Sequence, residues 1–192
     1  MNVRFNCLAA AFAAAAAAPL AAAQVVTVPA FTSVQLRGGG SLVVRQGPVQ
    51  RVTLVEGNSG ETRIRVTPEG ELRINACTGT CPKGYKLVIE VQTATVPGLA
   101  VFQGGRIDVD KSFSPQASLS AAVSGGGQID ARAVVARNAA ASLSGGGTIR
   151  LWAEQSLSAS VSGGGHVGYL GRPVLHTAIH SGTVAAEGNP AR

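Results

Sequence analysis

Aromatic residues are scarce in this chain of 192 residues, which has one tryptophan, two tyrosines and five phenylalanines. Proteins that bind single-stranded nucleic acids use platforms in which aromatic rings lie among basic residues. The few rings here are scattered and form no such platform. The net charge of +6 is modest and is spread along the chain. The sequence therefore gives no indication of a nucleic-acid partner.

Helical patterning is also missing. After the first 23 residues, no stretch sustains apolar residues at the 3.6-residue period of an amphipathic helix. Nor does this region contain a run of about 20 apolar residues, the length that crosses a bilayer as a helix. We therefore expect the mature chain to be all-β and not membrane-spanning.

The first 23 residues differ in composition from the rest. Arg4 gives a positive start, a run rich in Ala, Leu and Phe follows, and Ala21–Ala23 supplies small residues for cleavage. We interpret residues 1–23 as a secretory signal peptide that is removed before Gln24. A membrane anchor is the alternative, which Pro19 and the shortness of the run disfavour. Cleavage leaves 15 basic and 10 acidic residues, so the expected product is a basic protein in the periplasm, on the cell surface or secreted.

Cysteine is rare, and only Cys77 and Cys81 follow the proposed signal peptide. Oxidising compartments favour disulfides, and Gly79 between the two cysteines gives the loop flexibility. A redox-active or metal-binding thiol pair is the alternative, but no histidine or further cysteine lies nearby in the sequence. We predict a structural disulfide between Cys77 and Cys81, and no cofactor.

Glycine, in contrast, is abundant and recurs in a pattern. Three Ser-Gly-Gly-Gly motifs each follow an apolar residue and precede a polar residue and then Ile or Val, and weaker copies surround Gly104 and Gly182. Glycine suits a tight turn because it accepts positive φ. A unit that returns about every 20 residues is typical of a repeat fold. The predicted turn glycines are Gly125, Gly126, Gly127, Gly145, Gly146, Gly147, Gly163, Gly164 and Gly165.

Apolar residues fall into columns when these motifs are aligned. The first column after the turn contains Ile107, Ile129, Ile149, Val167 and Val184. Apolar and polar positions alternate on both sides of the turn, which is typical of strands with one buried face. Stacking such units predicts a parallel β-solenoid with Gly-rich tight turns. A series of antiparallel hairpins is the alternative.

The first part of the mature chain is β-rich as well, but it lacks the glycine period. Short alternating strands are separated by turn residues, so this part is expected to cap the open end of the solenoid. We expect one domain over residues 24–192. Its N-terminal β region covers residues 24–98, and its Gly-turn repeats cover residues 99–192.

Several segments together resemble a known bacterial family. They are Phe31-Thr32-Ser33-Val34, the strand and turn at Leu42–Gly47, the stretch LVIEVQTATVPGLAVFQGG and the serial glycine cassettes. In these segments the chain is similar to the putative auto-transporter adhesins with a head GIN domain. The resemblance implies a right-handed, two-sheet β-helix with a pectin-lyase-like shape, a role in adhesion and no catalysis.

The chain departs from that family in one column. The family has Asp before the Ile of each cassette, whereas this chain has Gln128, Thr148 and His166. A calcium or ligand role for that column is therefore not carried over.

A candidate binding site comprises Asp110, Arg132 and Trp152, which occupy the third outward column after the turn. Stacked strands bring such residues about 4.8 Å apart. Arg132 is expected to pair with Asp110 and to lie over the ring of Trp152, which would serve as a platform for a sugar. The alternative is that Trp152 covers a sheet edge and that the charges form a solvated ladder of little energetic weight. Asp130 and Arg150 form a second expected pair, which we interpret as structural.

No catalytic or metal site is predicted. His176 and His180 fall on the outer face of a strand, without the further ligands that a metal needs. The acidic residues of the glycine half are scattered over different units, and no Ser–His–acid pattern emerges.

The strand before each glycine turn has an outer face of small residues, which a second copy of the chain could approach closely. This face contains Ser120, Ala122, Ala140, Ser142, Ser158, Ser160, His176 and Ala178.

These observations predict an exported, non-catalytic binding or adhesion module of the bacterial cell envelope. Its expected partners are a glycan, an envelope or surface protein, or a second copy of itself through the Ser/Ala face. A carbohydrate-active enzyme of pectin-lyase-like fold and a purely structural envelope protein are the alternatives.

Overall fold

The computed structural model describes residues 23–110 and 113–188. The expected signal peptide, apart from Ala23, lies outside these residues, and so does Cys7. In the described part of the chain, regular secondary structure consists of strands alone, and no helix there could cross a membrane. The strands are β1 (Gln24–Val26), β2 (Ser33–Arg37), β3 (Ser41–Gln46), β4 (Arg51–Glu56), β5 (Arg63–Val66), β6 (Glu71–Asn75), β7 (Val88–Thr93), β8 (Gly98–Phe102), β9 (Arg106–Val109), β10 (Gln116–Ser124), β11 (Gln128–Ser144), β12 (Thr148–Ser162), β13 (His166–Leu170), β14 (Val174–Ile179) and β15 (Thr183–Ala186).

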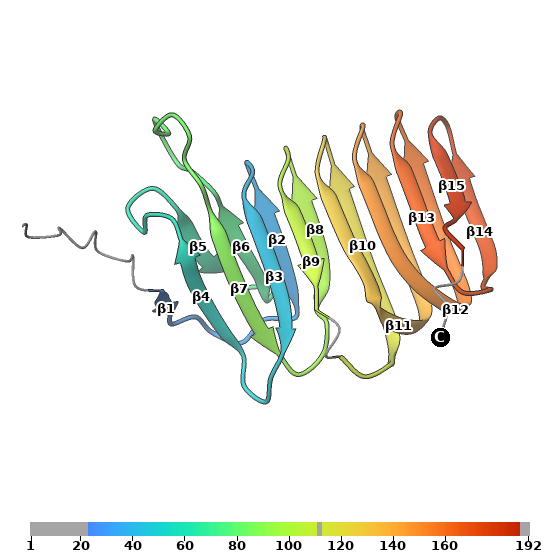
Figure 1. Cartoon of the computed structure of the whole chain (residues 1–192), viewed down its shortest axis with the longest axis horizontal. Coiled ribbons are helices and arrows are strands. Elements are labelled where there is room, and N and C mark those ends of the chain that lie inside the picture. Colours follow the sequence, from blue (N-terminus) through green and yellow to red (C-terminus); the bar gives the residue numbers. More distant parts are fainter. Residues whose placement is uncertain (1–22, 111–112, 189–192) are drawn as a thin grey trace, which may run out of the picture.

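All fifteen strands belong to one sheet that folds over on itself. β11 and β12 are long and bent, and each contributes to two faces (Figure 1). The first part of β11 pairs with β9, and its second part pairs with β10. One face therefore runs from β4, β7, β3 and β9 through the first parts of β11 and β12 to β13 and β15. The other face runs from β6, β2, β8 and β10 through the second parts of β11 and β12 to β14.

The expected fold class, a right-handed parallel β-helix or β-solenoid, is wrong. The protein is all-β, but its strands form a nearly closed, barrel-like sheet of mixed orientation. β4 is antiparallel to both β1 and β7, and β5 is antiparallel to β6, whereas β8 to β15 pair in parallel.

The physical reason lies in the first half of the chain, where the glycine period is missing. A hydrogen-bonded turn at residues 67–70 reverses the chain, since the amide of Gly70 donates to the carbonyl oxygen of Thr67 at 3.0 Å. β5 and β6 therefore pair as a hairpin. In addition, β11 and β12 bend continuously between the two faces instead of ending at corners.

The predicted columns of the second half are confirmed by the strand register. Ile129 lies opposite Ile107 on one side and Ile149 on the other. Val167 lies opposite Ile149 and Val184. The side chains of Ile107, Ile129, Ile149 and Val167 are at most 1% exposed. Alternation of apolar and polar residues therefore determines which side chains enter the core and which face outward.

The three glycines of each turn have different environments. Gly125, Gly145 and Gly163 have φ values of +96°, +113° and +111°, a region that other residues rarely adopt. The third glycine of each turn packs so closely that a Cβ would collide with the preceding turn or core, whereas a Cβ on Gly126, Gly146 or Gly164 would meet no atom within 4 Å. Neighbouring turns are linked, because the amide of Gly125 donates to Ser144 and that of Gly145 to Ser162, both at 2.8 Å.

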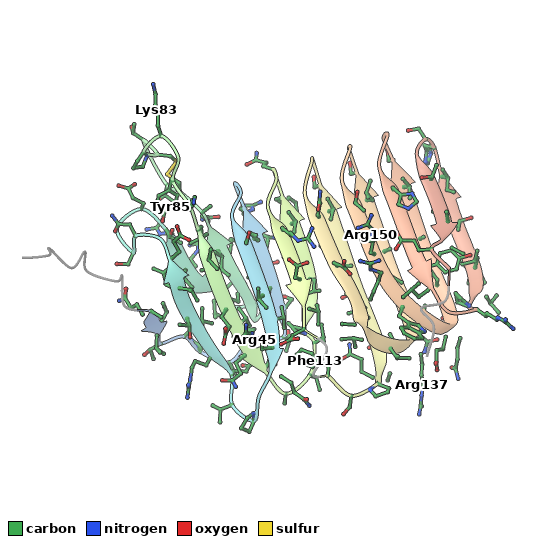
Figure 2. The ribbon with its side chains drawn as sticks, viewed as in Figure 1. Arg45, Lys83, Tyr85, Phe113, Arg137 and Arg150 are labelled. Carbon is green, nitrogen blue, oxygen red and sulfur yellow. A yellow bond between two sulfur atoms is a disulfide. The ribbon has the colours of Figure 1, made fainter. Side chains whose placement is uncertain are left out.

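The predicted disulfide between Cys77 and Cys81 is confirmed, with 5.9 Å between the Cα atoms. It closes an exposed loop between β6 and β7, with Lys83 toward the tip of that loop and Tyr85 nearer the sheet (Figure 2). The hydroxyl of Tyr85 accepts a hydrogen bond from the amide of Asn58 at 2.9 Å and lies 2.6 Å from the hydroxyl of Thr62. The disulfide therefore stiffens a loop that side-chain hydrogen bonds already attach to the loop between β4 and β5.

Candidate functional site: an outer groove beside Trp152

A groove of about 720 Å³ lies on the outer side of the face that contains β3, β9, β11 and β12. We call it the Trp152 groove, and its lining consists of Val43, Arg45, Asp108, Val109, Asp110, Asp130, Arg132, Ala133, Trp152 and Leu170. Trp152 also borders a second hollow of about 450 Å³, together with Tyr169 and Arg172. The half-buried indole therefore lies between two concave surfaces.

The three residues of the predicted binding site all line this groove, but not in the predicted arrangement. Between Ala131 and Val135 the register of β11 against β12 shifts, and Trp152 lies opposite Val135 rather than Arg132. A bulge adds residues to one strand only, and alternation alone does not reveal it.

The predicted partners of Arg132 are also different. In the described residues the only cation–π contact is Arg37 over Phe102, at 5.0 Å from the ring centre. Asp110 lies 3.8 Å from the guanidinium of Arg45. Arg132 instead pairs with Asp130. The groove therefore contains a tryptophan next to ion pairs rather than a stacked arginine and indole.

Each aspartate in the groove has an arginine nearby. Arg106 donates to both carboxylate oxygens of Asp108 at 2.6 Å, and Arg132 donates to those of Asp130 at 3.0 and 2.6 Å. Two parallel N–H···O bonds of this kind fix the geometry as well as the charge. The groove is therefore rich in charge yet close to neutral overall.

The pKa of Asp130 is shifted by two opposing effects. Burial raises the pKa of this carboxyl. The hydrogen bonds from the side chain and backbone of Arg132, together with the charges of Arg132 and Arg106, lower the pKa by a larger amount. The net result is a pKa below the ordinary aspartate value. Asp130 therefore remains a carboxylate at neutral pH.

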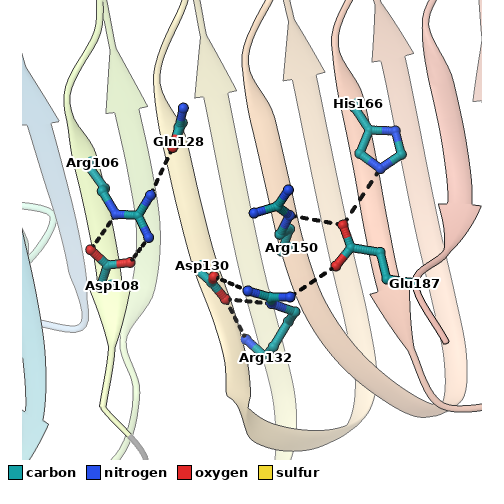
Figure 3. A network of polar contacts seen from close by, with 8 residues as sticks. All are labelled: Arg106, Asp108, Gln128, Asp130, Arg132, Arg150, His166 and Glu187. Carbon is teal, nitrogen blue, oxygen red and sulfur yellow. Dashed lines mark hydrogen bonds and ion pairs between the residues drawn. The ribbon is translucent and has the colours of Figure 1, made fainter. Parts of the chain in front are cut away.

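A second cluster lies beside the groove and centres on Glu187 (Figure 3). Its carboxylate accepts a hydrogen bond from Arg150 Nε at 2.9 Å and one from Arg132 Nη1 at 3.3 Å. His166 Nε2 lies 3.7 Å from the same carboxylate. Arg150 lies opposite Asp130 in the register, as expected, but its ion pair is with Glu187. The cluster connects β11, β12 and β13 to the residue that follows β15.

Sequence reasoning did not anticipate the role of Glu187, which lies 55 residues from Arg132. One signal was present in the sequence. The outward column that holds Asp130 and Arg150 continues with Gly168, where a Cβ would collide with the side chain of Glu187. A glycine in an otherwise charged column therefore marks the space that another side chain fills.

His176 lies in the end strand β14 and His180 follows it directly, and both side chains are exposed. Over residues 23–110 and 113–188, no group of three or more His, Cys, Asp or Glu side chains is arranged to hold a metal ion.

Fold and groove together define an all-β domain with a concave, charged outer surface. The family described as "putative auto-transporter adhesin, head GIN domain" has a model that matches residues 115–173, a segment that contains Arg132 and Trp152. The resemblance to this family that the sequence predicts is confirmed over that segment. No curated protein matches the chain.

The chain is similar to several solved structures. A putative adhesin from Bacteroides fragilis NCTC 9343 is 16% identical, with a TM-score of 0.53 over 85% of this chain and 94% of that chain. A putative lipid binding protein from Parabacteroides distasonis ATCC 8503 is 15% identical, with a TM-score of 0.37 over 86% of this chain and 96% of that one. A putative adhesin from Parabacteroides merdae ATCC 43184 is 12% identical, with a TM-score of 0.34 over 87% and 96%. Only the first likeness is close enough to support the fold.

Proposed function

We propose that this protein is an exported, non-catalytic binding module of the bacterial cell envelope that holds a glycan in the Trp152 groove. The observation that carries the proposal is a half-buried tryptophan between two concave surfaces, with charged hydrogen-bonding groups around it. An aromatic ring offers a flat apolar surface to one face of a sugar ring, while guanidinium and carboxylate groups hydrogen-bond its hydroxyls.

Pairing of the aspartates supports binding rather than catalysis. Glycoside hydrolysis needs one carboxylic acid with a raised pKa and a second carboxylate at a defined separation. Asp108 and Asp130 each accept two hydrogen bonds from an arginine, and the pKa of Asp130 is lowered. Both carboxylates are suited to fix side chains in place, and Asp130, whose pKa is lowered, is a poor proton donor.

Export rests on the proposed signal peptide and on the disulfide, which oxidising compartments favour. We expect protein recovered from the periplasm or medium of an expressing bacterium to begin at Gln24, as read by N-terminal sequencing. Recovery of an uncleaved chain in the cytoplasm would contradict export.

The binding proposal is tested with a glycan array on the mature protein. Trp152→Ala is expected to weaken binding to any glycan that the native protein recognises by about tenfold, which corresponds to about 1.4 kcal/mol. Trp152→Phe keeps a ring and should recover part of that loss.

Phe102→Ala is the matched control, since it removes a half-buried aromatic residue outside the groove. It should leave binding unchanged. Absence of binding to every glycan, or equal loss in the two alanine variants, would overturn the proposal.

A further inference from the structure

Three basic side chains from three neighbouring strands converge on one carboxylate, that of Glu187 (Figure 3). Arg132 extends from β11, Arg150 from β12 and His166 from β13. Their nitrogen atoms lie 3.3, 2.9 and 3.7 Å from the Glu187 oxygens. Such a convergence of donors on one point is the usual form of a site for an anionic group.

The carboxylate comes from outside the strands that supply the cations. Glu187 follows the last residue of β15, and its amide donates to the carbonyl oxygen of Tyr169 at 2.9 Å. Its side chain lies across Gly168, in space that any larger residue would fill. A side chain held at the end of a strand in this way can leave without disturbing the sheet that carries the cations.

Arg150 has hydrogen-bond donors that Glu187 does not use. Arg150 uses Nε for Glu187, and its two Nη groups have no hydrogen-bond partner in the described part of the chain. Its side chain is 41% exposed. Arg132 lines the Trp152 groove and also reaches Glu187. The cluster therefore adjoins the surface on which the proposed glycan lies.

Glu187 neutralises the positive charge that would otherwise attract an anion to this cluster. Arg132 and Arg150 are balanced by Asp130 and Glu187, so the two guanidinium charges are neutralised while Glu187 is in place. Departure of Glu187 would leave two guanidinium groups and one imidazole facing a single carboxylate, that of Asp130.

We propose that Arg132, Arg150 and His166 form a binding site for the carboxylate of an acidic sugar, and that Glu187 occupies this site until such a ligand displaces it. The inference deepens the proposed function and rests on it for the position of the sugar in the groove. The carboxylate-binding step itself is independent of Trp152 and can be measured separately.

The test uses D-glucuronate as the probe and D-glucose as its neutral counterpart, with binding followed by NMR of the ¹⁵N-labelled mature protein. Glu187→Gln keeps the shape of the side chain and removes its charge. It is expected to tighten glucuronate binding by about fivefold, because a tethered carboxylate competes at a millimolar effective concentration. Binding of glucose should not change.

Gly168→Ala is the second variant, because its Cβ pushes the Glu187 side chain aside and leaves every charge in the protein. It should also tighten glucuronate binding. Adding Arg150→Gln to Glu187→Gln should abolish the gain. Thermal unfolding of each variant shows whether it is folded. If Glu187→Gln fails to fold, Gly168→Ala still tests the inference, because it displaces the Glu187 side chain without removing its charge.

Unchanged or weaker glucuronate binding in both Glu187→Gln and Gly168→Ala would overturn the inference. So would tightening by Glu187→Gln alone, since that result would reflect net charge rather than a vacated site. If Trp152→Ala does not weaken glycan binding on the array while the glucuronate results are as expected, the glycan groove is contradicted and the carboxylate site is still supported.

Discussion

At the scale of single residues, the sequence predicts more of the fold than of the site. The glycine turns, the disulfide and the inward columns follow from local chemistry, and the structure confirms each of them. The partners of Arg132 do not follow from it. A bulge in β11 moves Trp152 out of line, and Glu187 arrives from a distant part of the chain. Pairing along a column is a local property, whereas an ion pair with a residue beyond the last strand depends on the whole fold.

The glycine turn offers a prediction with a control inside the same motif. Gly145→Ala and Gly147→Ala should each lower the free energy of unfolding by about 2 kcal/mol. Gly145 has φ +113°, and a Cβ there would lie 2.7 Å from the carbonyl oxygen of Gly125. A Cβ on Gly147 would press against Val123 and the carbonyl oxygen of Gly127.

Gly146→Ala is the control, because its Cβ would meet nothing within 4 Å. It should change stability by less than about 0.5 kcal/mol, as measured by urea denaturation. Equal losses at all three positions would show that the turn needs glycine for a reason other than φ and packing.

At the scale of elements, the bent strands β11 and β12 decide the architecture. The alternating residues of each predict two strands joined by a longer connection. In the structure, each of β11 and β12 is instead one continuous strand. This continuity places Asp130 and Arg132 at the bend beside the groove. The antiparallel pairs of β4 and β5 were equally hard to foresee, because short alternating strands carry no record of their partners.

The ion pair at the bend of β11 predicts a pH dependence. The folded-state pKa of Asp130 lies below its ordinary value, so the carboxylate form stabilises the fold. That contribution is fully present above the ordinary aspartate pKa of about 3.9 and is lost as the pH falls through the lowered folded-state value. Asp130→Asn should therefore cost about 1 kcal/mol at pH 7 and progressively less in acid.

Denaturation of native protein and variant at a series of pH values measures this difference. Asp110→Asn serves as the comparison, because the side chain of Asp110 is 47% exposed and water screens its charge. Its effect should be smaller. A penalty for Asp130→Asn that stays constant from pH 7 into acid would contradict the assignment.

At the scale of the whole molecule, the two outer faces differ in chemistry. One carries the Trp152 groove and its ion pairs, and the other carries small uncharged side chains along β10, β11 and β12. Periodicity predicts which side chains point outward on each face. It does not predict that the sheet folds over and nearly closes, because that shape depends on how far each long strand bends (Figure 1).

We propose the Ser/Ala face as a surface for self-association, since two copies can approach closely there without like-charge repulsion. Sedimentation velocity of the mature protein should show a species larger than the monomer that grows with concentration. Ser158→Arg, which places a charge on this face, should return it to the monomer. A monomer at every concentration would count against this surface.

The position of the bound ligand tests the central claim most directly. The chain has a single tryptophan, so the indole N–H of Trp152 gives one resolved signal in an NMR spectrum of the mature protein. On titration with a glycan identified from the array, that signal and the amides of Val43 and Ala133 should shift most, since all three residues line the groove. Shifts confined to the Ser/Ala face, with the indole signal unmoved, would contradict the account.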